Sequence, residues 1–478
     1  MVKDLTTGSP VKALVLFSIP MVVATVFQQL YNLADSIIAG RVLGVDALSA
    51  TSVSYPVTLI YVAVAQGCAN GAAVVIANLM GRRRYTDMKS AISTTVISML
   101  AIGVVLTVVG EVFCSGILGL LNTDASIFTD SYTYLQIYTF GVIFVLLYNA
   151  ATAAFNAMGD SRTPLILLIF SSVINVVLDI VFTLDACGVR LGVAGLAWAT
   201  FVAQGAACVA ALIWMALRLS RIREDSEQDE DALAAIRNST APHAHHRLHL
   251  PHPTFKLFSA HQLRSILPIA LPSVVQQIFV PLGLLFVQSI VNGFASPVIA
   301  GYTSAVKVNT LCVSCNTMFS NAVSAYSAQN RGAGKEDRVV RGLKASVVVA
   351  IIIAAVFTAL SFFCSEQLID LFASEGDAQH ADMVDAGSLF LTITSPFYVI
   401  VGVELVFNGL HRGTRHMIFF MSSTIADLVL RVVLAFVLAP VLGYAGIGWA
   451  YSFSWCIGLA VAFGCFLTGR WKKKIETE

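Results

Sequence analysis

Acidic side chains inside apolar stretches are the residues of this sequence best suited to do chemistry. Asp179 lies in the run SSVINVVLDIVF, four residues after Asn175, and Asp35 ends the apolar run QQLYNLADSII. A spacing of four places Asn175 and Asp179 on one face of a helix, one turn apart. Burial disfavours a charged carboxylate, so both acids can take up a proton near neutral pH. The alternative for Asp35 is a hydrated carboxylate at the end of its helix.

The second half of the sequence carries a different set of charges. A shift of 252 residues moves Asn175 and Asp179 onto Asp427 and Arg431, an opposite-charge pair one helical turn apart. Such a pair can cancel its own charge, and a structural role for it is the favoured interpretation. Glu404 is a further acid in an apolar stretch. We expect Lys307 to pair with Glu404.

Motifs for covalent or metal chemistry are incomplete in this sequence. The stretch around Arg331–Lys335 fails the GxxxxGK[ST] pattern, and Ser304–Lys307 fits SxxK without its companion motifs. Cys312 and Cys315 form one CxxC within an apolar run. The tract His243–His252 can bind Zn²⁺ but lacks an ordered frame, so a flexible linker is favoured there. We expect no enzyme activity, no resident metal and no cofactor.

Twelve long apolar stretches must position these residues. Hydrophobic residues make up 57% of the chain and charged residues 12%, against roughly 25% charged in soluble domains. A helix needs about 20 mostly apolar residues to cross the hydrocarbon core. The sequence therefore predicts an all-α polytopic membrane protein in a lipid bilayer. The expected spans are 11–36, 47–72, 88–112, 132–156, 164–185, 192–217, 264–291, 298–323, 342–364, 385–410, 416–440 and 445–469.

The sequence repeats itself at about half its length. GVAGLAWA at Gly192–Ala199 returns 251 residues later as GYAGIGWA at Gly443–Ala450, and Pro20 corresponds to Pro272 at a similar offset. Internal repeats are typical of transporter folds, with binding sites between the repeats. We expect a first unit at 1–217, a linker at 218–262, a second unit at 263–470 and a tail at 471–478.

The basic residues predict the orientation in the membrane. Lys and Arg accumulate in cytoplasmic loops, and most of the 29 fall on one side of the twelve-span arrangement. We therefore expect both termini in the cytoplasm and the chain in the cell inner (plasma) membrane. The clusters are Arg82–Arg84, Arg218–Arg223, Arg331–Lys344, Arg412–Arg415 and Lys472–Lys474.

Three motifs, taken in order, suggest a family. They are IPMVVATVFQQLYNLADSIIAGRVLG at Ile19–Gly44, the GDSRTP turn at Gly159–Pro164 and AYSAQNRGAG at Ala325–Gly334. Over nearly its whole length the chain resembles MATE-type (multidrug and toxic compound extrusion) transporters, and it is most similar to the DinF-like branch. The resemblance implies two six-helix lobes that enclose a central cavity and are related by a pseudo-twofold axis along the membrane normal.

The same resemblance implies a coupling site in the first lobe. The residues that match the polar network of the DinF-like branch are Asp35, Tyr134, Asn149, Asn175 and Asp179, while Thr152 stands where relatives can have Asn. The NorM-like branch places acids in its seventh and tenth helices. Here the seventh has none and the tenth has only Glu404, which argues against Na⁺ coupling in the second lobe.

The expected activity is antiport by alternating access. A cation, H⁺ with Na⁺ as the alternative, enters while small amphiphilic drugs or metabolites leave, cationic ones among them. Pro20 cannot donate to the Leu16 carbonyl, so the first helix can bend there. The cavity residues that we expect are Gln28, Phe279, Phe286 and Gln288, with Phe294 as a further candidate.

We expect the chain to act as a monomer without a nucleic-acid partner. A flippase for lipid-linked oligosaccharides, which has a related architecture, is the alternative function. It requires a markedly cationic cavity for its phosphate-bearing lipid, and only Lys307 and Arg431 are available inside the expected spans.

Overall fold

The structure is a computed structural model, and its helices follow the predicted apolar stretches. It describes residues 4–38, 45–121, 123–183, 191–239, 255–372 and 379–472, except for the side chains at 33–38, 45–48 and 223–239. Twelve spans in these ranges are long and apolar enough to cross a membrane, and the same ranges contain no β-strand. The predicted all-α membrane fold is confirmed.

The helices follow one another as two similar sets. The first set is α1 (Pro10–Ile38), α2 (Val45–Gly81), α3 (Tyr85–Leu120), α4 (Phe128–Ala157), α5 (Arg162–Thr183) and α6 (Gly192–Ser239). The second set is α7 (Ala260–Val291), α8 (Ser296–Gly332), α9 (Glu336–Phe363), α10 (Ser365–Asp370), α11 (His380–Thr394), η3 (Ser395–Phe397), α12 (Tyr398–Gly413), α13 (Met417–Leu442), α14 (Ala445–Leu467) and η4 (Arg470–Lys472).

Two regions differ from the predicted arrangement of twelve uninterrupted spans with a linker between the two units. The tenth predicted span consists of α11 and α12 joined by the short 3₁₀ turn η3 at Pro396, which has no backbone N–H to continue an α-helix. Part of the expected linker is helical, because α6 continues to Ser239. The tract His243–His252 lies outside the described residues.

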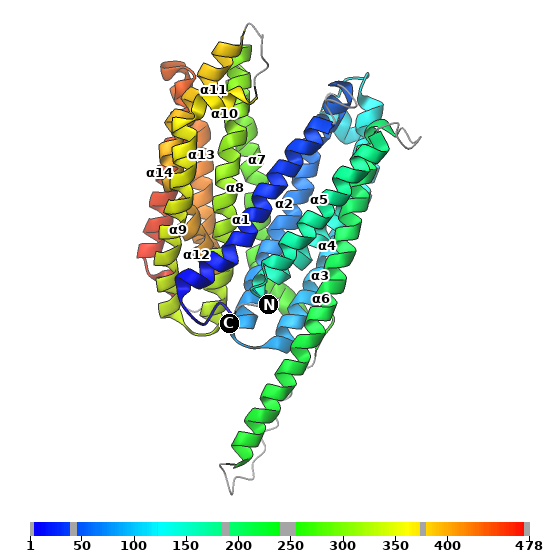
Figure 1. Cartoon of the computed structure of the whole chain (residues 1–478), viewed down its shortest axis with the longest axis vertical. Helices are drawn as coiled ribbons and strands as arrows, with labels where there is room; N and C mark the ends of the chain where they lie inside the picture. The colour runs from blue at the N-terminus through cyan, green and yellow to red at the C-terminus, as the bar shows by residue number, and fades with distance from the viewer. Residues whose placement is uncertain are drawn as a thin grey trace.

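Helices α2–α6 form a first bundle and α8–α14 a second bundle. In Figure 1 the two bundles diverge at the upper end and meet at the lower end. The lower end holds the α2–α3, α8–α9 and α12–α13 turns. Because Arg82–Arg84, Arg331–Lys335 and Arg412–Arg415 lie in or beside those turns, we call it the basic end.

The first helix of each repeat crosses from one bundle to the other. Leu14 and Phe17 of α1 are buried in one cluster with residues of α8, α9 and α12, and α1 then runs obliquely to α5 (Figure 1). Helix α7 does the same in the opposite direction. Its Ala270 is buried against the first bundle, whereas its Val287 is buried in the second. Each crossing helix therefore contacts both bundles.

The bundles meet at the basic end through a symmetric contact of α2 with α8. A Cβ atom added at Gly81 would overlap the Gln329 carbonyl, and one added at Gly332 would overlap the Asn78 carbonyl. The same offset of 251 residues relates Gly81 to Gly332 and Asn78 to Gln329. Only glycine allows this approach of the two backbones. The Gln329 amide also donates to the Ala157 carbonyl of the first bundle at 2.7 Å.

Candidate functional site

The first bundle contains a buried carboxylate that is linked to the crossing helix α1. Asp179 is 0% exposed and Asn175 is 2% exposed, both on α5 as the spacing of four predicts. With its amide oriented to satisfy its neighbours, Asn175 donates to Asp179 Oδ2 at 3.1 Å and to the Tyr31 hydroxyl at 2.6 Å. Its carbonyl oxygen then accepts from the backbone N–H of Thr200 at 3.0 Å. Asn175 thereby connects α5 with α1 and α6.

The start of α5 is fixed by the GDSRTP turn. Asp160 is buried, and its carboxylate accepts from the Thr163 backbone N–H at 3.2 Å and from the Thr163 hydroxyl at 2.9 Å. A capping side chain of this kind satisfies a helix-end donor that has no partner within the helix. The cap sets the helical register that carries Asn175 and Asp179.

Two members of this cluster were not among the sequence-predicted site residues. Tyr31 stands one turn before Asp35 in the motif QQLYNLADSII, so a signal for it was present in the sequence. Thr200 contributes a backbone N–H, which no side-chain pattern marks. Asp35 lies in α1, and its side chain is outside the described residues.

The other predicted coupling residues lie on α4, and two of them bond within that helix. The Asn149 amide donates to the Val145 carbonyl at 2.8 Å, and the Thr152 hydroxyl donates to the Asn149 carbonyl at 3.1 Å. The Tyr134 ring stacks on Tyr138 with 6.2 Å between ring centroids. Their role in coupling stays a prediction.

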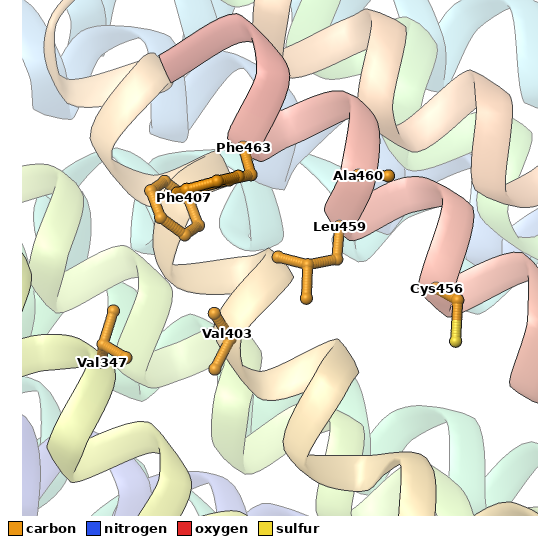
Figure 2. A pocket seen from close by; sticks show the side chains of 7 residues that line it. All are labelled: Val347, Val403, Phe407, Cys456, Leu459, Ala460 and Phe463. Carbon is orange, nitrogen blue, oxygen red and sulfur yellow. The ribbon is translucent and has the colours of Figure 1, made fainter. Parts of the chain in front are cut away.

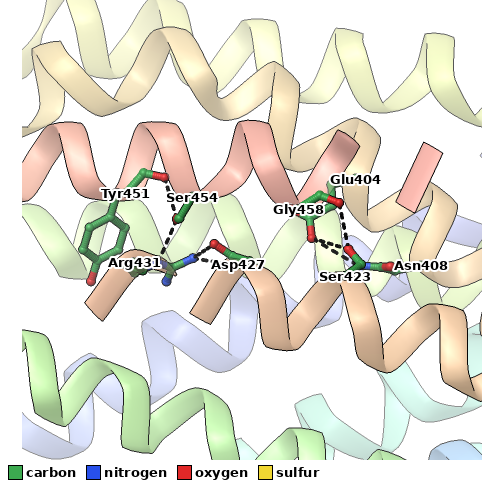
Figure 3. Close-up of polar contacts among 8 residues, drawn as sticks. All are labelled: Glu404, Asn408, Ser423, Asp427, Arg431, Tyr451, Ser454 and Gly458. Carbon is green, nitrogen blue, oxygen red and sulfur yellow. Dashed lines mark hydrogen bonds and ion pairs between the residues drawn. The ribbon is translucent and has the colours of Figure 1, made fainter. Parts of the chain in front are cut away.

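The second bundle holds a different carboxylate cluster (Figure 3). Glu404 of α12 is 3% exposed, and its Oε1 accepts from the Ser423 hydroxyl at 2.9 Å and from the Asn408 amide at 3.4 Å. Among the described residues Oε2 has no hydrogen-bond partner. A Cβ atom at Gly458 of α14 would lie 2.6 Å from Oε1, so the carboxylate packs directly on that helix backbone.

The predicted pair of Asp427 and Arg431 is confirmed. One guanidinium nitrogen of Arg431 lies 2.8 Å from Oδ1 and 2.7 Å from Oδ2 of Asp427. Arg431 Nε donates to the Ser454 hydroxyl at 3.3 Å, and the guanidinium lies 4.5 Å from the centroid of the Tyr451 ring. Both side chains are buried, and each compensates the charge of the other (Figure 3).

The expected pairing of Lys307 with Glu404 is wrong. Lys307 is exposed, with its Nζ 5.5 Å from the centroid of the Phe372 ring. The reason is helical geometry: Asn316 lies on the face of α8 that Gly402 of α12 contacts. Lys307 is nine residues away, about two and a half turns, and therefore lies on the opposite face.

The expected cavity residues are scattered along α1 and α7. Gln28, Phe279 and Phe286 are exposed, and the Gln288 amide donates to Asn292 Oδ1 at 2.8 Å. The Phe294 ring lies edge-on to Tyr444 with 6.1 Å between centroids. Their contact with a transported molecule stays a prediction.

Two apolar hollows lie on the second bundle, apart from all these residues. One, of about 400 Å³, is lined by Val347, Val403, Phe407, Cys456, Leu459, Ala460 and Phe463 of α9, α12 and α14 (Figure 2). The other, of about 550 Å³, is lined by α13 alone, between Ile418 and Leu430. Their linings are almost wholly apolar, and the Ser422 hydroxyl in the second hollow donates to the Ile418 carbonyl at 2.7 Å.

Two repeated sets of spanning helices, each with a buried carboxylate cluster, define a polytopic membrane transporter of internally repeated architecture. The chain belongs to the MatE family, whose model matches residues 20–181 and 272–437. The two matched segments begin at Pro20 and Pro272, in agreement with the repeat in the sequence.

Similar proteins cover almost the whole chain. It is 28% identical over 477 residues to "Probable multidrug resistance protein YpnP" of Bacillus subtilis (strain 168), covering 99% of both chains. It is 21% identical to "FAD transporter" of Shewanella oneidensis, covering 87% of this chain and 84% of that protein. The family model and the first of these relatives place the chain among the transporters of a multidrug efflux family.

Solved structures share the fold. The structure titled "Outward-facing conformation of a multidrug resistance MATE family transporter of the MOP superfamily" has a TM-score of 0.82 at 22% identity and covers 98% of this chain and 97% of that one. "Crystal structure of MATE in the bent conformation" has a TM-score of 0.80 at 21% identity, with 98% and 96% covered. The two-lobe architecture that the resemblance implies is thus confirmed.

Proposed function

We propose that this protein exports small amphiphilic compounds, cationic ones among them, in exchange for H⁺. The observation that carries the proposal is the Asn175 amide, which bonds at once to a fully buried carboxylate and to the helix that crosses between the bundles. Placing an acid at the middle of a membrane span costs about 2.5–3.5 kcal/mol, and acids kept there are functional candidates.

A proton on Asp179 would change how α1 is held. The ionised carboxylate only accepts hydrogen bonds, and Asn175 satisfies it with an N–H donor. The protonated carboxyl group has a donor of its own and is a weaker acceptor, so the hydrogen bond from Asn175 weakens and its link to Tyr31 can rearrange. The proton can shift the balance between two arrangements of α1 by no more than its difference in affinity for them.

Pro20 stands where that shift can become a bend. It lies between Phe17, which is buried in the second bundle, and Tyr31, which reaches α5 of the first. Its ring and missing N–H weaken the helix at this point. A change at Tyr31 can therefore alter the angle between the two parts of α1, and with it the angle between the bundles.

The energy available is sufficient for export. A gradient of one pH unit with about 100 mV across the membrane supplies about 3.7 kcal/mol per proton. One proton per neutral solute would sustain a gradient of several hundred-fold. The names of the YpnP relative and of "Multidrug export protein MepA" of Staphylococcus aureus support a drug-like cargo.

We also propose that the basic end faces the cytoplasm, with both termini there and the chain in the inner membrane. One chain carries both bundles and both crossing helices, which favours a monomer as the working unit. A lipid-linked oligosaccharide flippase is not favoured, because neither basic residue inside the expected spans is available to a phosphate: Asp427 neutralises Arg431, and Lys307 lies against Phe372.

The test is transport by purified protein in proteoliposomes with an imposed pH gradient or an imposed Na⁺ gradient. Asp179→Asn should abolish pH-driven movement of ethidium, and a Na⁺ gradient alone should not drive the wild type. Asp124→Asn is the matched control, since this acid lies in the α3–α4 turn and bonds to Ser126. Unchanged pH-driven transport in Asp179→Asn would refute the coupling assignment.

A further inference from the structure

Arg412, the penultimate residue of α12, is a buried cation without an acidic partner. It is 6% exposed, and its contacts are Ser324 and Asn321 of α8 and the ring of Phe420 on α13. None of these groups is charged, and no ion pair of Arg412 occurs in the described part of the chain. The contrast is Arg431, which is equally buried but faces the carboxylate of Asp427. An uncompensated buried charge is costly, so a cation kept in such surroundings calls for an explanation.

The groups around Arg412 are arranged to donate hydrogen bonds. Arg412 Nε donates to the Ser324 hydroxyl oxygen at 3.4 Å, which leaves the hydroxyl hydrogen for another acceptor. A terminal nitrogen of Arg412 donates to Asn321 Oδ1, which directs the Asn321 amide nitrogen away from the guanidinium. In the described part of the chain that amide donates to the thioether of Met318, a weak acceptor, at 3.5 Å. Guanidinium, amide and hydroxyl together offer donors to an anion.

The cluster lies at the contact between the bundles. Asn321 is seven residues, about two turns, from Ala328, so both lie on the same face of α8. Ala328 and Phe420 are buried in one cluster with residues of α2, α4 and α7, including Ala154 and Ala270. Phe420 therefore separates the guanidinium from the first bundle in this arrangement. Parting of the bundles at the basic end would uncover Arg412.

The repeat offers an internal comparison. At an offset of 252 residues, Arg412 corresponds to Asp160, whose carboxylate caps α5 through Thr163. The first bundle thus has an acid with a structural task at the position where the second has an unpaired cation. The buried cation therefore has no counterpart at this position of the first repeat.

We propose that Arg412, with Asn321 and Ser324, forms a subsite for the carboxylate or phosphate of a transported amphiphile when the bundles part at the basic end. This inference rests on the proposed export function and deepens it by naming a substrate class. A guanidinium pairs with planar oxyanions through two N–H donors, and Phe420 supports its face. Substrates of this class carry one anionic group on an apolar body.

Binding of a matched dye pair tests the subsite. The probes are a rhodamine with a free benzoate carboxylate and its methyl ester, measured by fluorescence polarisation with purified protein in phosphatidylcholine nanodiscs. Arg412→Gln should weaken binding of the acid by about tenfold or more and leave the ester unchanged, since a charge-assisted hydrogen bond is lost. Arg412→Lys should recover part of the affinity for the acid, because it restores the charge. Lys307→Gln, which removes an exposed cation of the same bundle, should bind both dyes as the wild type does.

Two outcomes would overturn the subsite. Equal weakening of acid and ester in Arg412→Gln would mean that the arginine only supports the packing of α8, α12 and α13. Unchanged binding of the acid would mean that no anion contacts it. The same measurement in phosphatidylglycerol nanodiscs distinguishes a substrate site from a lipid site. If the Arg412-dependent preference for the acid over the ester persists there, the site binds substrate. If that preference is lost, the site binds a lipid headgroup.

The same dyes distinguish this inference from the proposed function. If no pH gradient drives either dye in proteoliposomes while Arg412→Gln still loses affinity for the acid alone, the coupling proposal fails and the subsite stands. If both dyes are exported equally by the wild type and by Arg412→Gln, export stands and the subsite fails.

Discussion

Asp179 and Glu404 are both buried carboxylates in spanning helices, yet their hydrogen bonds lead to different parts of the molecule. Asp179 is linked through Asn175 to Tyr31 of α1, a helix that contacts both bundles. Glu404 is bonded to Ser423 and Asn408 and packs on Gly458, all within the second bundle. A proton on Asp179 can therefore alter the relation between the bundles, whereas a proton on Glu404 acts first inside one of them.

The largest expected effect separates these two acids directly. Asp179→Asn should eliminate export driven by a pH gradient, because the asparagine cannot exchange a proton. Glu404→Gln should retain pH-driven export, since its partners do not include a crossing helix. Proteoliposome transport at matched protein incorporation measures both. If Glu404→Gln lost pH-driven export while Asp179→Asn retained it, proton coupling would belong to the second bundle and not to the first.

The next effect concerns the charge pair beside Glu404. Asp427→Asn leaves the buried guanidinium of Arg431 without its acid, and breaking one side of a buried pair costs about 3–5 kcal/mol. We expect a marked fall in the thermal unfolding temperature of the detergent-solubilised protein. The double variant Asp427→Leu with Arg431→Met should recover most of the loss, because neither charge remains. A single variant as stable as the wild type would contradict a structural role for the pair.

A smaller effect tests the link from Asp179 to α1. Tyr31→Phe removes the hydroxyl that accepts from Asn175. The loss of this hydrogen bond, about 0.5–1.5 kcal/mol, corresponds to a change of up to about tenfold in coupled transport. Tyr326→Phe is the matched comparison, because the Tyr326 hydroxyl donates to the Arg338 carbonyl within the second bundle. Equal effects of the two variants on the pH dependence of export would remove Tyr31 from the coupling path.

The sequence predicted the features that depend on spacing within one helix. The spans follow from runs of apolar residues, and the neighbours Asn175 with Asp179 and Asp427 with Arg431 follow from a spacing of four. Helix interruption at Pro396 has an equally local cause, the missing backbone N–H, although the apolar run alone did not show it.

Contacts between helices were predicted less well. The pairing of Glu404 with Lys307 failed because composition does not reveal which face of α8 meets α12. Thr200 was missed because it acts through its backbone, and the glycine contacts at Gly81 and Gly332 depend on how two helices cross. The symmetry of that crossing was nevertheless present in the sequence, because the repeat offset relates Gly81 to Gly332 and Asn78 to Gln329.

The smallest expected effect compares the two crossing helices. Gln277 of α7 donates to Gln66 Oε1 of α2 at 2.7 Å, a neutral link between α7 and the first bundle. Gln277→Ala should lower the free energy of unfolding by about 1 kcal/mol. It should change the export rate by the same factor at every pH, because neither amide titrates. Tyr31→Phe should instead change the pH dependence itself, since its partner Asn175 also bonds to Asp179. Transport rates measured over a series of imposed pH gradients compare the two variants. A pH-dependent effect of Gln277→Ala would mean that α7 also carries the proton signal and that the division between the bundles is incomplete.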